Sequence, residues 1–135
     1  MGKGRGDGSM EERILIVDDE EMVCSLLARR LAKERYFCVT AHNGREALNH
    51  FYKDQFSLII SDIKMPEMDG VELLKQVKAM DPNMMVIMVT AYPDLDLVVE
   101  AMRLGAYDFI TKPVNLELVV HSVEGFGEEK TGTGN

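Results

Sequence analysis

The sequence predicts an α/β protein of the flavodoxin-like class, a doubly wound (βα)5 fold with a five-stranded parallel sheet in strand order 2-1-3-4-5. Five short apolar segments alternate with five segments whose apolar residues recur at helical spacing. This alternation is typical of parallel strands joined by right-handed crossover helices that cover both faces of a sheet. With 135 residues, the chain is long enough for one such domain and too short for two.

The first two units have clear strand and helix patterns. Residues 13–17 (RILIV) form an uninterrupted apolar run of the kind found in buried parallel strands, and a helix is expected over about 20–34. Residues 37–41 (FCVTA) form the second strand. Asn43, followed three residues later by Glu46, is a capping-box signature for the second helix.

The third and fourth units follow the same pattern. Residues 57–61 are expected to be a strand, and Asp69 caps a third helix that ends before Asp81-Pro82-Asn83. Val71, Leu74, Val77 and Met80 would form its inward stripe. Residues 84–89 form the fourth strand, which ends at Thr90, and a fourth helix spans about 94–104 before Gly105.

The fifth unit closes the domain. Residues 107–110 form the last strand, and Asn115 caps a final helix that is expected to be short and to end near Glu124. The chain then becomes glycine-rich and polar. The expected organisation is a disordered tag or linker over 1–10, the folded domain over 11–124 and a flexible tail over 125–135.

Composition narrows the class of protein. The net charge of −8 and sequence pI near 4.8 argue against direct nucleic-acid binding by this chain. Its apolar runs are too short to span a bilayer, and no signal peptide is present. Cys24 and Cys38 lack metal-ligand spacing and are expected to be buried free thiols. These features indicate a soluble cytoplasmic protein with no membrane partner.

Polar residues follow four of the predicted strands: Asp18 and Asp19, Asp62, Thr90 and Lys112. Each has an ordinary explanation. Asp62 fits a loop aspartate, the Asp18-Asp19 pair fits a helix N-cap, and Thr90 and Lys112 fit a strand end and a solvated charge. In strand order 2-1-3-4-5, however, all of them reach the carboxyl edge near the switch in strand order, where ligands bind in open α/β sheets.

Such a cluster requires positive charge. Two carboxylates about 4 Å apart repel each other by roughly 4 kcal/mol at an effective dielectric constant of 20. Lys112 supplies one positive charge, and a hard divalent cation with oxygen ligands is the natural second. Mg2+ suits a site with few carboxylates, several waters and a phosphate oxygen.

The combined motifs resemble the receiver domain of two-component response regulators. They are Asp18-Asp19 after the first strand, SDIKMPEMDG around Asp62, MVTAYPD around Thr90, and GAYDFITKP, which contains Lys112-Pro113. The resemblance covers roughly 13–124. Among receivers, the sequence looks most like the N-terminal receivers of NtrC-like regulators.

The resemblance implies a phosphoacceptor switch that works on itself and is not a turnover enzyme. Asp62 would take a phosphoryl group from a sensor histidine kinase. Asp19, Asp62 and the backbone carbonyl of Lys64 would hold Mg2+, with Asp18 acting through water. The side chains of Lys64 and Tyr92 occupy positions that tune the lifetime of the phosphate.

The resemblance also implies how the signal would leave the site. Lys112 and Thr90 would bind phosphoryl oxygens, and Lys112-Pro113 would be a cis peptide bond. Thr90 would move inward on phosphorylation and Phe109 would follow. Many receivers have tyrosine at the position of Phe109. Taken alone, Phe109 also fits an ordinary aromatic residue of the core.

The fourth helix is the candidate output surface. Its apolar residues Leu95, Val98, Val99 and Met102 span a wider arc than one core-facing stripe needs. Together with the fifth strand and fifth helix, this face could bind an effector domain or a second copy of the chain. Deep packing of the fourth helix would explain the same pattern.

Three other functions fit parts of the sequence. A Mg2+-dependent aspartyl-phosphate phosphatase would usually carry a second acid at the position of Lys64. A flavodoxin-like binding module would need a phosphate loop where residues 17–21 (VDDEE) are acidic and would repel phosphate. A phosphate-independent pseudo-receiver would lack site residues that are present here.

Overall fold

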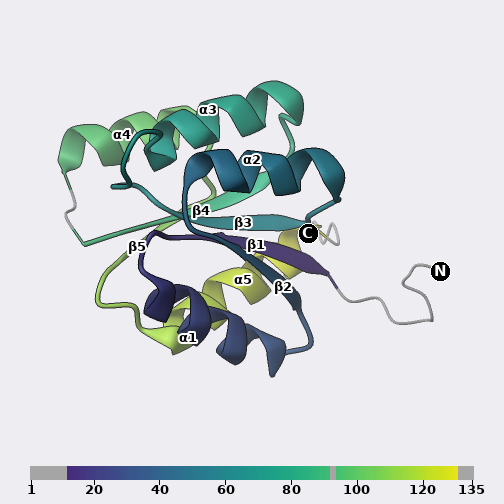
Figure 1. The fold of residues 1–135 in the computed structure, drawn as a ribbon. Coiled ribbons are helices and arrows are strands. Elements are labelled where there is room, and N and C mark those ends of the chain that lie inside the picture. The colour runs from purple at the N-terminus through teal and green to yellow at the C-terminus, as the bar shows by residue number, and fades with distance from the viewer. Residues whose placement is uncertain (1–11, 92–93, 131–135) are drawn as a thin grey trace.

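The computed structural model describes residues 12–91 and 94–130 of the chain. Strands and helices alternate through these residues (Figure 1). They are β1 (Arg13–Val17), α1 (Glu21–Ala32), β2 (Phe37–Ala41), α2 (Gly44–Lys53), β3 (Leu58–Asp62), α3 (Gly70–Met80), β4 (Met85–Thr90), α4 (Leu95–Arg103), β5 (Asp108–Thr111) and α5 (Leu116–Lys130).

The five strands form one parallel sheet in the order β2-β1-β3-β4-β5. Helices α2, α3 and α4 cover one face of the sheet, and α1 and α5 cover the other (Figure 1). The predicted flavodoxin-like fold and its strand order are therefore confirmed. The order reverses between β1 and β3, so the carboxyl ends of these two strands flank the expected ligand-binding crevice.

Two apolar layers hold the helices to the sheet. β3 is buried along its whole length, as expected for a central strand that is covered on both faces. Leu15 and Ile59 pack on the α2–α3–α4 side, whereas Ile14 and Ile60 pack on the α1–α5 side. The alternation follows from the two-residue repeat of a strand. The carboxyl edge of the sheet is thus supported by apolar layers that exclude water on both faces.

The predicted helix caps are present. The Asn43 side chain accepts a hydrogen bond from the Glu46 N–H at 2.8 Å, and Asp69 accepts one from the Glu72 N–H at 2.9 Å. Asn115 accepts from the N–H groups of Glu117 and Leu118 at 3.0 and 3.2 Å. These bonds satisfy amide donors that a helix leaves unpaired at its start.

Several predicted boundaries need correction. β3 and β5 each lie one residue later than expected, and α1 ends at Ala32 instead of Glu34. β4 begins at Met85 instead of Met84 and ends at Thr90, as expected. Helix α5 is not short: it continues to Lys130. Glycine costs only about 1 kcal/mol inside a helix and does not by itself end one whose Val119, Val120 and Val123 are anchored in the core.

The side-chain predictions need smaller corrections. Met80 does not belong to the inward stripe of α3, because its side chain is 43% exposed. Both cysteines are free, but only Cys24 is buried, while Cys38 is half-buried. Burial raises the pKa of each thiol to about 11, so both stay protonated at neutral pH.

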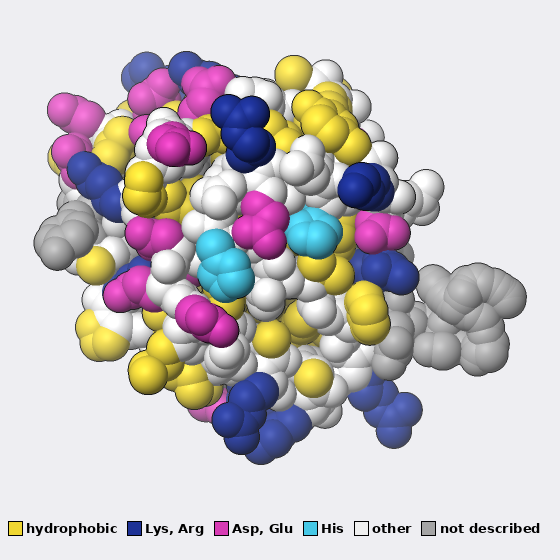
Figure 2. Space-filling view, in the orientation of Figure 1, with side chains coloured by type: hydrophobic (Ala, Val, Ile, Leu, Met, Phe, Trp, Pro, Cys, Tyr) yellow, Lys and Arg dark blue, Asp and Glu magenta, His cyan; other side chains and the backbone are white. Residues whose placement is uncertain are grey.

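The surface carries mixed charge. On the face shown in Figure 2, lysine and arginine side chains lie scattered among aspartates and glutamates. In the described part of the chain, no helix combines the length and apolarity that crossing a bilayer requires.

Candidate functional site

The sheet itself delivers the predicted site residues to one edge. Asp62 is the last residue of β3, and Thr90 is the last residue of β4. Asp18 follows β1 directly, and its N–H donates to the Ala41 carbonyl at 3.0 Å; the Lys112 N–H donates to the Thr90 carbonyl at 2.8 Å. Because these bonds continue the strand pairing past the strand ends, the backbone fixes where both side chains start.

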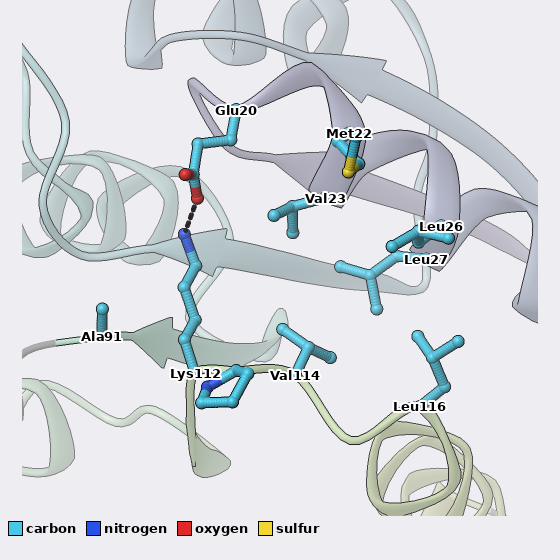
Figure 3. A pocket seen from close by; sticks show the side chains of 10 residues that line it. Glu20, Met22, Val23, Leu26, Leu27, Ala91, Lys112, Val114 and Leu116 are labelled. Carbon is cyan, nitrogen blue, oxygen red and sulfur yellow. Dashed lines mark hydrogen bonds and ion pairs between the residues drawn. The ribbon is translucent and has the colours of Figure 1, made fainter.

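Lys112 is the centre of the cluster. Its Nζ lies 3.0 Å from Asp18 Oδ2 and 3.1 Å from Asp62 Oδ2. A third carboxylate, that of Glu20, approaches Nζ to 2.8 Å (Figure 3). The side chains of Lys112, Asp18 and Asp62 are 11%, 3% and 5% exposed, so these three charges interact largely out of water. The expected meeting of the carboxylates with Lys112 is therefore present.

Glu20 was not among the predicted site residues. Its place directly after Asp18-Asp19 marks it as the start of α1, which conceals its part in the site. The sequence offered one chemical signal: a run of acidic residues follows the first strand, and Lys112 follows the last. Only the packing of β5 beside β4 shows that the Lys112 ammonium group reaches Glu20.

Burial raises the pKa of the two inner acids, Asp18 and Asp62. Desolvation raises the pKa of Asp18, although hydrogen bonds from the Glu20 N–H and from Lys112 oppose the shift. Desolvation and the nearby charge of Asp18 raise the pKa of Asp62, against the hydrogen bonds from Lys112 and the Lys64 N–H. Burial lowers the pKa of Lys112, but its carboxylate partners outweigh burial and raise that pKa overall.

The acids also form a geometry that suits a metal ion. One carboxylate oxygen from each of Asp18, Asp19 and Asp62 can lie within 4.8 Å of the others. Asp19 is exposed, whereas Asp18 and Asp62 are buried. Hard oxygen donors with an open side toward solvent match the preferences of Mg2+, which keeps several of its waters. The residues therefore fit the predicted cofactor.

A glycine allows the loop after β3 to close tightly behind Asp62. The Gly70 N–H donates to the Ile63 carbonyl at 2.8 Å. A Cβ at this position would lie 2.2 Å from the Asp62 carbonyl oxygen, so no other residue fits without displacing the backbone of Asp62. Gly70, the first residue of α3, thus lets the chain pack directly against the backbone of Asp62.

The remaining predicted residues lie around this cluster. Thr90 is fully buried, and Phe109 is half-buried against the apolar cluster on the α2–α3–α4 face. The Lys112–Pro113 peptide bond is cis, as predicted. The side chain of Lys64 is exposed. Tyr92 lies outside the described residues.

An apolar groove of about 450 Å³ opens beside Lys112 (Figure 3). We call it the α1 groove; its lining residues are Glu20, Met22, Val23, Leu26, Leu27, Ala91, Lys112, Pro113, Val114 and Leu116. Met22 and Leu26 are 73% and 47% exposed. Exposed apolar side chains next to a polar cluster are typical of a surface that contacts another molecule.

Residues 14–124 match the family model described as the response regulator receiver domain. Among curated proteins, Sporulation initiation phosphotransferase F of Bacillus subtilis (strain 168) is 39% identical over 117 residues, which cover 87% of this chain and 94% of that protein. The DNA-binding transcriptional regulator NtrC of Escherichia coli (strain K12) is 40% identical over 111 residues, which cover 82% of this chain but only 24% of NtrC.

Solved structures agree with this match. A response regulator receiver domain protein (CheY-like) from Methanospirillum hungatei JF-1 superimposes with a TM-score of 0.85 at 36% identity, over 90% of this chain and 99% of that one. The BeF3-activated DrrB receiver domain superimposes with a TM-score of 0.81 at 28% identity, over 88% and 99% of the two chains.

Proposed function

Because the chain belongs to the response regulator receiver domain family, we propose that Asp62 accepts a phosphoryl group from a sensor histidine kinase with the help of Mg2+. The observation that carries this proposal is the contact of one half-buried ammonium group, Lys112 Nζ, with the buried acids Asp18 and Asp62 at about 3 Å. A nucleophile, its acidic neighbour and a group for the phosphoryl oxygens then occupy one edge.

The reaction is a displacement at phosphorus. A carboxylate oxygen of Asp62 attacks the phosphorus of a phosphohistidine, and a P–O bond forms as the P–N bond breaks. The electron pair of that bond stays on the imidazole nitrogen, and Asp62 becomes an acyl phosphate. The domain modifies its own side chain, so the step is not turnover of a separate substrate.

Lys112 and Thr90 stabilise the transferred group. The Lys112 ammonium donates to Asp62 Oδ2 at 3.1 Å and would bond a phosphoryl oxygen once the group is transferred. Thr90 at the end of the neighbouring strand supplies a hydroxyl for another. Fixed donors that face developing charge are the largest contribution to most phosphoryl transfers.

Mg2+ would be held by Asp19, Asp62 and the Lys64 carbonyl, with Asp18 acting through water. When bound, the ion neutralises negative charge on the carboxylates and on the incoming phosphoryl group. The chain's own contribution is to keep three acids within reach of one another at a site that Lys112 alone neutralises only in part. Lys64 and Tyr92 are proposed to tune the lifetime of the product.

The change caused by phosphorylation would be transmitted to a partner that binds the α4–β5–α5 face. A phosphoryl group adds roughly 1.5 to 2 negative charges, which would draw Thr90 inward and let Phe109 follow. Leu95, Val99 and Met102 of α4 are 74%, 43% and 45% exposed, so this face offers apolar area for a partner. We propose an effector domain or a second copy of the chain as that partner.

The α1 groove is the proposed docking surface for the kinase. It opens beside Lys112, so a helix that binds there would hold its phosphohistidine near Asp62. Met22 and Leu26 provide the apolar contacts. A helix in an apolar groove is a common recognition mode and needs no charge complementarity from an acidic chain.

The test is direct. The chain is incubated with Mg2+ and acetyl phosphate, and intact mass spectrometry compares wild type with Asp62→Asn. We expect one phosphoryl adduct on wild type that chelation of Mg2+ reduces, and none on the variant. An equal adduct on both proteins, or none on wild type, would contradict the proposal.

A further inference from the structure

Glu20 has an unusual position for a helix N-cap. The N-cap side chains of α2, α3 and α4 each accept a backbone N–H of their own helix. Glu20 makes no such bond, and its carboxylate instead extends to Lys112 Nζ at 2.8 Å. The Glu20 carboxylate therefore pairs with a residue of another element and not with the backbone of its own helix.

Three carboxylates surround the ammonium group of Lys112. An ammonium group has three N–H donors and no acceptor. Here Nζ donates to Glu20 at 2.8 Å and to Asp62 at 3.1 Å, and it forms an ion pair with Asp18 at 3.0 Å. A phosphoryl oxygen that bonds to Lys112 therefore competes with these carboxylates for the ammonium group.

Burial determines which carboxylate gives way to the phosphoryl oxygen. The side chains of Asp18 and Asp62 are 3% and 5% exposed, and Asp18 is also held by the Glu20 N–H at 2.8 Å. Asp62 loses its own carboxylate charge when it becomes an acyl phosphate, so Asp18 and Glu20 are the carboxylates that remain. Losing the Lys112 contact would leave Asp18 as an unpaired buried charge, which is costly. The Glu20 side chain is 61% exposed, so water can solvate its carboxylate once it leaves.

We propose that Glu20 is a displaceable counter-ion of Lys112 that competes with the phosphoryl group for that ammonium. This inference rests on the proposed function of Asp62. In the unphosphorylated protein, the Glu20 carboxylate pairs with Lys112 at the rim of the α1 groove (Figure 3). On phosphorylation the Glu20 carboxylate moves into solvent, and its departure sets part of the free energy of the phosphorylated state.

Beryllofluoride, a non-reactive mimic of the phosphoryl group, measures the competition without chemistry. We would titrate it into wild type, Glu20→Gln, Glu20→Asp and Glu21→Gln at Mg2+ concentrations that saturate each protein, with 19F NMR as the readout. Glu21→Gln is the matched control, because Glu21 is an adjacent exposed acid that is not among the carboxylate partners of Lys112.

We expect Glu20→Gln to bind beryllofluoride about threefold more tightly than wild type, the scale of one partly exposed ion pair. Glu20→Asp, which keeps the charge but has a shorter reach, should fall between the two, and Glu21→Gln should match wild type. In metal-free protein, Glu20→Gln but not Glu21→Gln should shift the 15N resonance of Lys112 Nζ.

The opposite results are distinct. Equal or weaker binding by Glu20→Gln than by Glu21→Gln would show that Glu20 supports Lys112 instead of competing, and would overturn this inference alone. A wild-type chain that neither binds beryllofluoride nor gains an adduct from acetyl phosphate would overturn the proposed function together with it.

Discussion

The start of α1 and the start of α3 contain the same kind of residue in opposite roles. At α3, the Asp69 carboxylate accepts the Glu72 N–H and stabilises its own helix. At α1, Asp18 and Glu20 turn their carboxylates toward Lys112, although Asp18 also accepts the Glu20 N–H. Asp69 is half-exposed, whereas Asp18 is buried. A carboxylate therefore stabilises the fold at the start of α3, whereas the buried carboxylate at the start of α1 opposes folding.

The difference shows where the fold has given up stability for function. A cap satisfies donors that would otherwise be unpaired, so it contributes free energy of folding. Acids packed together out of water oppose folding unless a cation offsets them. Removing a capping acid should therefore lower the free energy of unfolding, whereas removing an acid from the buried cluster should raise it.

The largest effect should come from Lys112→Met. This change keeps the apolar stem but leaves Asp18 and Asp62 as buried acids without their ammonium partner. We expect the free energy of unfolding at pH 7 to fall by about 3 kcal/mol in metal-free buffer. Urea titrations with and without Mg2+ would check this, and Mg2+ should restore part of the loss. An unchanged free energy of unfolding would mean that Asp18 and Asp62 do not need Lys112 to offset their buried charge.

Asp62→Asn should have the opposite sign. Removing one buried charge from the cluster should raise the free energy of unfolding by about 1 kcal/mol at pH 7 without metal. Burial and Asp18 raise the folded-state pKa of Asp62 above its ordinary value of 3.8. The folded state then binds more protons than the unfolded state between the two pKa values, so wild-type stability falls as pH rises through that window.

The pH profile provides the control for Asp62→Asn. The advantage of the variant should disappear below about pH 3.8, where the carboxyl group is protonated in both the folded and the unfolded chain. Urea midpoints measured from pH 3 to pH 8 would reveal the trend. A variant that is less stable than wild type at pH 7 would contradict the view that Asp62 is held at a cost.

The smallest effects should come from the caps. Asp69→Ala should lower the free energy of unfolding by about 1 kcal/mol, because the Glu72 N–H loses its acceptor. Glu20→Ala occupies the equivalent position of α1 but removes no cap, so it should cost less. Thermal unfolding of the two variants in parallel would compare them, and a larger loss for Glu20→Ala would reverse the distinction.

Most of the fold could be predicted because periodicity and turn chemistry agree. β1 and β2 have the predicted bounds, and the caps at Asn43 and Asp69 are formed. The length of α5 could not be predicted, because composition after Glu124 suggested a tail whereas the packing of residues such as Val123 sustains a helix. The local sequence pattern does not show how far tertiary packing will extend a helix.

The candidate site was predictable in part for a related reason. Asp18, Asp62 and Lys112 follow strands, and the strand order alone brings them together. Glu20 could not be assigned because its direction depends on the rotamer chosen at the start of α1, which only the position of Lys112 determines. Its role became visible from a distance between two residues 92 positions apart.

The central claim, that Asp62 is the acceptor, is tested most directly by locating the modified side chain. Borohydride reduces an acyl phosphate to an alcohol and leaves a free carboxylate unchanged, so it marks the phosphorylated residue with a permanent change in mass. After acetyl phosphate, Mg2+ and borohydride, peptide mass spectrometry should find the reduced side chain at position 62. Reduction at Asp18 or Asp19 in place of Asp62 would contradict the assignment.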